Sequence, residues 1–134
     1  MPPFDWDSKY ETGIDSFDGQ HVALFQSAKN LHDSFVKGLS ADAITHTLNH
    51  LLIYCSTHLE DEEAHMSAAA YPSLRDHQAE HRDLMTRVYH LRDQYLQGET
   101  SMALDLSLLI VTWFRRHILE HDQGFADYLR KEAD

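Results

Sequence analysis

Residues 74–95 read LRDHQAEHRDLMTRVYHLRDQY, and their apolar positions recur at the three- and four-residue spacing of one α-helical face. Leu84 and Val88 continue that face along the stretch. His77 and His81 fall in the same register one turn earlier, where apolar residues would be expected. The stretch therefore predicts a helix that carries two histidines on its buried face.

Three other stretches show the same periodicity. The first, from residue 18, has apolar positions at Val22, Phe25, Ala28, Leu31, Phe35 and Val36. The second follows a predicted N-cap at Ser40 and has Ile44, Leu48, Leu51, Leu52, Cys55 and Leu59. The last has Leu104, Leu108, Val111, Phe114 and Ile118. Because the connections are short, neighbouring helices must be antiparallel, and the predicted fold is all-α, an up-down-up-down antiparallel four-helix bundle.

The first seventeen residues have no helical period but carry Phe4, Trp6, Tyr10 and Phe17. They predict a non-helical aromatic N-terminal arm (about 1–17) that lies on the bundle (about 18–131). The length of 134 residues fits one domain over 1–134.

Charge and cysteine content restrict the class of protein. The chain has 11 Lys and Arg against 22 Asp and Glu, a formal net charge of -11, which disfavours nucleic acids and anionic membranes as partners. No apolar window is long enough to span a bilayer. Cys55 is the single cysteine and cannot form an internal disulfide, so we expect a protein of a reducing compartment, the cytoplasm.

Histidine is unusually abundant, with 11 residues, and is the side chain most used to bind transition metals. Three pairs have the i,i+4 spacing that shares one helical face, where chance predicts about one. They are His46 with His50, His77 with His81, and His117 with His121. His46 and His50 alternate with the apolar positions, so we interpret them as part of a solvated face.

The remaining candidates come from three other helices. His58 and Glu62 lie one turn apart near the buried edge of the second helix, and His21 stands alone at the start of the first. The acidic partner of His117 stays open between Glu120 and Asp122, and His121 competes with both. Asp122 would need a local distortion or a helix end, because five residues rotate an ideal helix off the His117 face.

Taken together, these motifs resemble the hemerythrins, specifically the bacterial branch with a short aromatic arm. The match runs over nearly the whole chain, as one lone His followed by His-x3-Glu, His-x3-His and His-x4-Asp in that order. Here those motifs are His21, His58 to Glu62, His77 to His81, and His117 to Asp122. The resemblance favours Asp122 over Glu120 and His121.

The resemblance implies an oxo- or hydroxo-bridged pair of iron ions. His77, His81 and His117 would hold one iron, His21 and His58 the other, and Glu62 and Asp122 would bridge both. The iron with two histidines would keep an open position for oxygen. We expect Leu24, Phe25, Leu59, Trp113 and Ile118 to line a dry oxygen pocket, although each would serve equally well as ordinary core.

Five imidazoles and two carboxylates favour oxygen binding over oxygen cleavage, because oxygen-activating bundles use a richer carboxylate shell. We therefore expect a protein that is not an enzyme and binds O2 reversibly for carriage, storage or delivery. The alternatives are a domain of a signalling protein that senses oxygen, redox state or NO, and a di-iron enzyme that consumes peroxide. A role in iron handling ranks lower, because those relatives use additional glutamates in place of His-x4-Asp.

Overall fold

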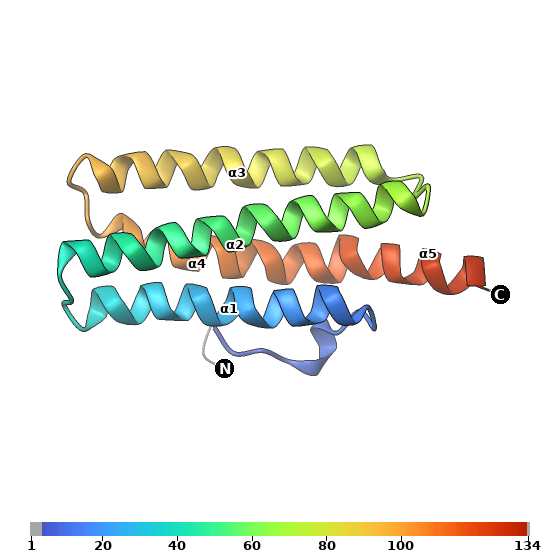
Figure 1. Ribbon diagram of the computed structural model, residues 1–134, viewed down its shortest axis with the longest axis horizontal. Helices are drawn as coiled ribbons and strands as arrows, with labels where there is room; N and C mark the ends of the chain where they lie inside the picture. The colour runs from blue at the N-terminus through green and yellow to red at the C-terminus, as the bar shows by residue number, and fades with distance from the viewer. Residues whose placement is uncertain (1–3, 134) are drawn as a thin grey trace.

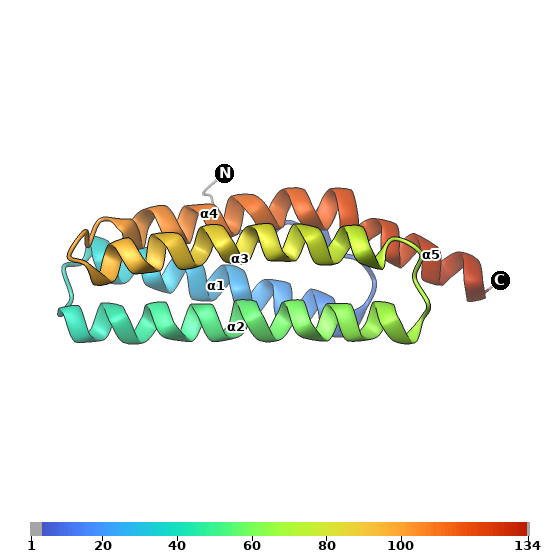
Figure 2. The same ribbon diagram turned by 90° about the horizontal axis from the view of Figure 1, so that it is seen from above.

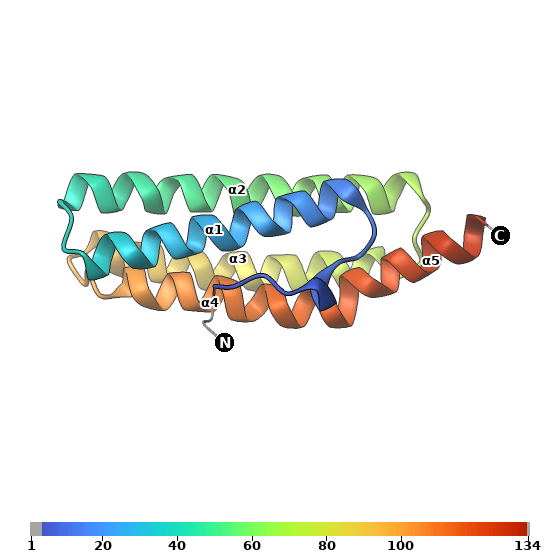
Figure 3. The same ribbon diagram turned by 90° about the horizontal axis from the view of Figure 1, so that it is seen from below.

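Four long helices lie side by side with alternating direction in the computed structural model (Figures 1 and 2). They are α1 (Asp15–Val36), α2 (Ala41–Ala68), α3 (Leu74–Leu96) and α4 (Met102–His117). A π-helical turn, η2 (Ile118–Asp122), joins α4 to α5 (Gln123–Ala133), which runs at an angle to α4 and extends beyond the other helices (Figures 1 and 3). The structure describes residues 4–133, and these contain no strand. The predicted all-α four-helix bundle is confirmed.

Local sequence signals explain where the helices begin and end. The Ser40 hydroxyl accepts a hydrogen bond from the Ala43 amide at 3.2 Å, so Ser40 caps α2 as predicted. Gly38 and Gly98 follow the ends of α1 and α3 with φ of +69° and +109°, a backbone conformation that favours glycine. None of the described helices is long and apolar enough to cross a membrane.

The arm differs from its prediction in two respects. It contains a short 3-10 turn, η1 (Ser8–Tyr10), and α1 begins at Asp15, three residues before the expected boundary. The described part of the arm lies beneath α1 in Figure 1 and in front of α4 in Figure 3, and its Trp6 ring packs edge to face with Phe25 of α1, with ring centroids 5.5 Å apart. The first three residues of the expected arm, and residue 134, lie outside the described part of the chain.

The Asp18 carboxylate fixes the end of the arm to the first turn of α1. Its oxygens accept hydrogen bonds from the Thr12 amide and hydroxyl, both at 2.8 Å, and from the Gly13 amide at 3.1 Å. At the start of α5, the side-chain amide of Gln123 donates to the backbone carbonyl oxygen of Glu11 at 2.8 Å. These hydrogen bonds connect the arm to the first turn of α1 and to the first turn of α5.

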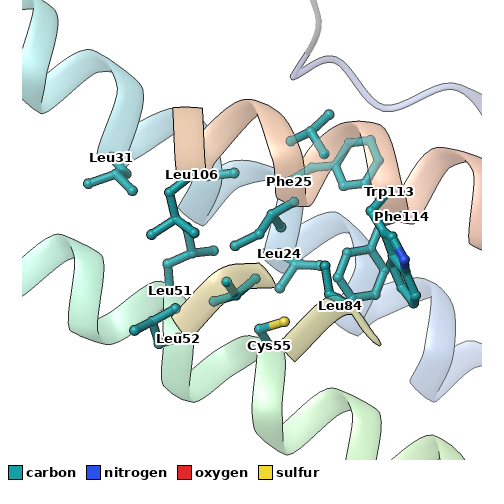
Figure 4. Packing of buried hydrophobic residues seen from close by; sticks show 14 of the residues in the cluster. Leu24, Phe25, Leu31, Leu51, Leu52, Cys55, Leu84, Leu106, Trp113 and Phe114 are labelled. Carbon is teal, nitrogen blue, oxygen red and sulfur yellow. The ribbon is translucent and has the colours of Figure 1, made fainter. Parts of the chain in front are cut away.

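The bundle interior holds two apolar clusters. In the larger, Leu24, Leu51, Leu84 and Leu106 from the four helices meet in the middle of the bundle (Figure 4). The smaller consists of Phe17, Met66 and Phe125, near the junction of η2 and α5. The candidate site lies between the two clusters.

Three of the predicted apolar positions are exposed instead of buried. Val22 is 44% exposed, Val36 64% and Leu108 39%. Val111, Phe114 and Ile118 are buried as predicted, but in the first half of α4 the buried face runs through Ala103, Leu106 and Ile110 instead of Leu104 and Leu108. The α4 sequence is apolar on several faces, so its periodicity alone did not determine which face packs inward.

Candidate metal centre

Seven polar side chains from all four helices and η2 converge in the interior, and each is at most 3% exposed. α1 contributes His21, α2 contributes His58 and Glu62, α3 contributes His77 and His81, α4 contributes His117, and η2 contributes Asp122. These are the seven residues that the sequence singled out. The structure brings all of them together.

Three of the imidazoles form one group. His117 Nε2 lies 2.9 Å from His77 Nε2 and 3.2 Å from His81 Nε2. Glu62 Oε1 lies 3.2 Å from His81 Nε2 and 3.3 Å from His117 Nε2. The three nitrogens therefore face one another around a single point, and one oxygen of Glu62 faces the same point.

The other two imidazoles form a second group beside the first. Their ring centroids, those of His21 and His58, are 4.5 Å apart. Glu62 Oε2 lies 3.0 Å from His58 Nε2 and 3.8 Å from His21 Nε2. Asp122 Oδ2 completes the group at 3.2 Å from His21 Nε2.

Each carboxylate reaches both groups. Glu62 directs Oε1 to the three-histidine group and Oε2 to the two-histidine group. Asp122 does the same, because its Oδ1 lies 3.0 Å from His77 Nε2 while its Oδ2 faces His21. Two carboxylates that each place one oxygen in each group are suited to bridge a pair of metal ions.

The polar atoms of the centre are not satisfied by hydrogen bonds alone. Within the described chain, His21 Nε2, His58 Nε2, Glu62 Oε2 and Asp122 Oδ2 are buried without a hydrogen bond of acceptable geometry. Buried polar groups are ordinarily paired, because an unpaired one costs about 1–3 kcal/mol. Ligand atoms about 2 Å from one ion and at right angles to each other lie about 3 Å apart. The observed spacings fit that arrangement, so these residues suit a pair of transition-metal ions with mixed nitrogen and oxygen ligands.

The π-helical turn η2 explains how a carboxylate five residues after His117 joins the centre. An α-helix would rotate Asp122 off the His117 face, whereas the wider π turn adds one residue without changing the direction of that face. His117 Nε2 and Asp122 Oδ1 are 3.3 Å apart as a result. The local distortion that the sequence required for Asp122 is present.

Charges inside the centre shift the pKa values of His21, His77 and Glu62. Burial alone would lower the pKa of His21 and of His77, but contacts with Asp122 and Glu62 raise each to about 9. Burial alone would raise the pKa of Glu62, yet the surrounding histidines hold it well below its usual range. At neutral pH and without bound cations, protons on His21 and His77 would balance part of the negative charge of the two carboxylates.

The other sequence candidates lie outside the centre. His46 and His50 are exposed on α2, as predicted. Glu120 is exposed and pairs with Arg116 at 3.5 Å. His121 is partly exposed, with Nε2 3.4 Å from Glu80 Oε1, and stacks on the outer side of His117.

The predicted pocket residues Leu24, Phe25, Leu59, Trp113 and Ile118 are all buried in the larger apolar cluster. Trp113 stacks on His117, with ring centroids 4.3 Å apart and planes at 17°. Leu59 lines a surface pocket of about 170 Å³ between α2 and α3, which His81 and Glu63 also line. The pocket role of these five residues stays a prediction.

The sequence analysis missed several contacts around the centre. Phe114 and Phe17 both lie against His58, with ring centroids 5.7 Å and 6.1 Å from its own. Gln20 and Glu63 contact the outer nitrogens of His58 and His81. Gln20 directly precedes His21, and Glu63 directly follows Glu62. Each contacts a histidine on a different helix, and the spacing of residues along one helix does not indicate such a contact.

Comparison with known proteins gives a consistent result. The profile of the hemerythrin HHE cation binding domain matches residues 12–129. The chain is 30% identical to a bacteriohemerythrin of Pseudomonas aeruginosa over 93% of its length and 80% of that protein's. It is 27% identical to a bacteriohemerythrin of Clostridium acetobutylicum, over 92% and 99% of the two chains. It is also 29% identical to myohemerythrin-1 of Phascolopsis gouldii, over 90% and 89%. No solved structure matches the chain significantly.

Proposed function

The chain belongs to the hemerythrin HHE cation-binding family, and we propose that it binds O2 reversibly at two iron ions for carriage, storage or delivery. Hemerythrins are oxygen-binding proteins with a non-haem di-iron centre, which supports oxygen binding rather than catalysis. The proposed iron ligands are His21, His58, Glu62, His77, His81, His117 and Asp122.

The observation that carries this proposal is the unequal division of the donors. The three-histidine group has five donors when one oxygen of each carboxylate is included, and the two-histidine group has four. Iron commonly accepts up to six ligands, so the two-histidine side has more room for an external molecule. Two ferrous ions, one in each group, would supply the electrons that oxygen binding requires.

The protein around the centre supports reversibility by excluding water. Phe17 and Phe114 enclose the His58 ring, and Trp113 covers one face of His117. Water and protons promote loss of the oxygen as superoxide or peroxide, which would leave the irons oxidised, so a dry surrounding prolongs the reversible state. We propose that Leu24, Phe25, Leu59, Trp113 and Ile118 contribute to that surrounding.

Two further proposals concern the chain as a whole. We propose that residues 1–134 form one hemerythrin-like domain, which the family match over 12–129 supports. We also propose a cytoplasmic setting. Cys55 is buried and makes no disulfide within the described chain, and burial raises the pKa of its thiol to about 12, which keeps it unreactive.

The test is to reduce the iron-loaded protein under argon, record its absorption spectrum, admit oxygen, and then remove it. We expect two irons per chain and a charge-transfer band that appears with oxygen and disappears on its removal. His21→Gln should abolish the band, whereas the matched exposed variant His50→Gln should retain it. A band that never bleaches would favour a redox sensor or a peroxide-consuming enzyme, and absence of iron would refute the proposal.

A further inference from the structure

In two of the proposed ligands, His58 and His81, the Nδ1 atom that points away from the centre contacts a partner of different charge. His58 Nδ1 lies 2.6 Å from the side-chain oxygen of Gln20, and His81 Nδ1 lies 2.8 Å from Glu63 Oε2. His58 belongs to the two-histidine group and His81 to the three-histidine group. The two-histidine group therefore has a neutral amide as its outer partner, and the three-histidine group has a carboxylate.

Asp61 determines which way the Gln20 amide points. The Gln20 nitrogen lies 2.8 Å from Asp61 Oδ2, and a carboxylate only accepts, so this end of the amide must be the donating NH2. The amide oxygen consequently faces His58, and the hydrogen between them must come from His58 Nδ1. The two hydrogen bonds, from Gln20 to Asp61 and from His58 to Gln20, thus fix His58 with its Nδ1 protonated and its Nε2 directed at the centre.

Glu63 fixes His81 in the same way without an intermediary. Its carboxylate accepts from Nδ1, which leaves Nε2 of His81 to face His117 Nε2 at 3.2 Å. Gln20, Asp61 and Glu63 are all partly exposed, so none is needed to fill the core. Their positions instead match those of side chains that orient metal ligands from outside.

We propose that Gln20 and Glu63 are positioning residues that make the two metal positions electronically unequal, with the weaker donor at the two-histidine position where an external ligand enters. A histidine that donates to a carboxylate becomes a more basic ligand than one that donates to an amide. A more basic ligand stabilises the more positively charged state of the ion. The neutral partner of His58 therefore favours return of the two-histidine position to its reduced state.

This inference rests on the proposed iron ligation, and exchange of the two partner types tests it. Under argon, Gln20→Glu should lower the midpoint potential of the iron-loaded protein, and Glu63→Gln should raise it. Gln26→Glu on α1 and Glu60→Gln on α2 make the same charge changes at exposed positions and should leave the potential nearly unchanged. Gln20→Leu, which removes the acceptor, should weaken iron binding by about 10-fold.

A second readout uses no redox chemistry. In the zinc-loaded wild-type protein, nuclear magnetic resonance should detect hydrogen-bonded Nδ1 protons on both His58 and His81, and the His58 signal should move in Gln20→Leu. Potentials that do not move, or that move in the same direction in both exchange variants, would overturn the inference, as would a His58 without an Nδ1 proton. Opposite shifts in a protein that fails to release oxygen would uphold the inference and refute the proposed function.

Discussion

His117 and Asp122 are five residues apart in sequence, yet His117 Nε2 and Asp122 Oδ1 lie 3.3 Å apart because η2 widens the helix between them. The same carboxylate turns its other oxygen to His21, 3.2 Å away. One side chain at the end of a π turn thus connects the last helix of the bundle to the first, across both groups of the centre.

Asp122→Asn should lower the iron content from two ions per chain to about one or less. The amide has nearly the size of the carboxylate, but its NH2 cannot donate a lone pair to a metal, so one of the two bridging positions is lost. Elemental analysis after anaerobic reconstitution measures the loss. Asp127→Asn, in the exposed part of α5, is the matched control and should retain two irons.

Deletion of Leu119 should preserve the metal centre. Leu119 lies within η2 and is 45% exposed, so its removal converts the π turn to an α-helical one and places the carboxylate four residues after His117. Deletion of Leu108, also exposed but in regular α4, should rotate the following residues by about 100° and abolish iron binding. Equal loss of iron in both deletions would contradict this account of η2.

The metal-free protein should lose stability as the pH rises from about 6.5 to 9. The pKa of His21 and of His77 is raised to about 9 in the folded state from an ordinary value of 6.5. Their contribution to stability is therefore complete below pH 6.5 and is lost as the pH passes about 9. Thermal unfolding of the chelator-treated protein across this range measures the effect, and His21→Gln should flatten it.

Acidification should also destabilise the metal-free protein, through Glu62 instead of the histidines. The carboxyl pKa of Glu62 lies well below its ordinary value of 4.5, so its contribution is present above pH 4.5 and is lost as the pH falls through the folded value. Stability of the metal-free form should consequently be greatest between about pH 4.5 and 6.5. A maximum near pH 9 would contradict the proton affinities described for the centre.

Leu59→Ala should shorten the lifetime of the oxygenated protein. Leu59 is 3% exposed and separates the interior from the surface pocket beside His81, so its truncation opens a path for water. The substitution should also cost about 2–5 kcal/mol of stability. Leu48→Ala removes an equally buried leucine farther along α2 and should cost similar stability without faster oxidation, as measured by the decay of the oxygen-dependent absorption band.

The features that a single helix encodes could be predicted from the sequence. The register of His77 and His81 with Leu84 predicted that both histidines face inward, and both do. The need for a distortion before Asp122 also followed from helix geometry, and η2 provides it. Whether these side chains bind iron stays a prediction, which the experiments above address.

Features that depend on how helices rotate against each other could not be predicted in this way. Val22 and Val36 fit an apolar pattern on α1 but are exposed, because the packed face is selected by the neighbouring helices. The contacts of Gln20 with His58 and of Glu63 with His81 cross between helices, and no spacing within one helix encodes them. The arm was expected to be non-helical, but residues 8–10 form a turn whose Asp7 cap was not recognised.

The paired carboxylates at the centre create a local conflict in an otherwise consistent core. Elsewhere in the interior, leucines from four helices pack against one another, whereas here like charges on Glu62 and Asp122 are enclosed together and rely on protons or cations for compensation. The energy landscape of this chain is therefore frustrated at the centre, because two buried carboxylates repel each other there. Bound cations would remove that frustration by compensating both charges. Iron supply would then decide both whether the protein can act and how deep its native energy minimum is.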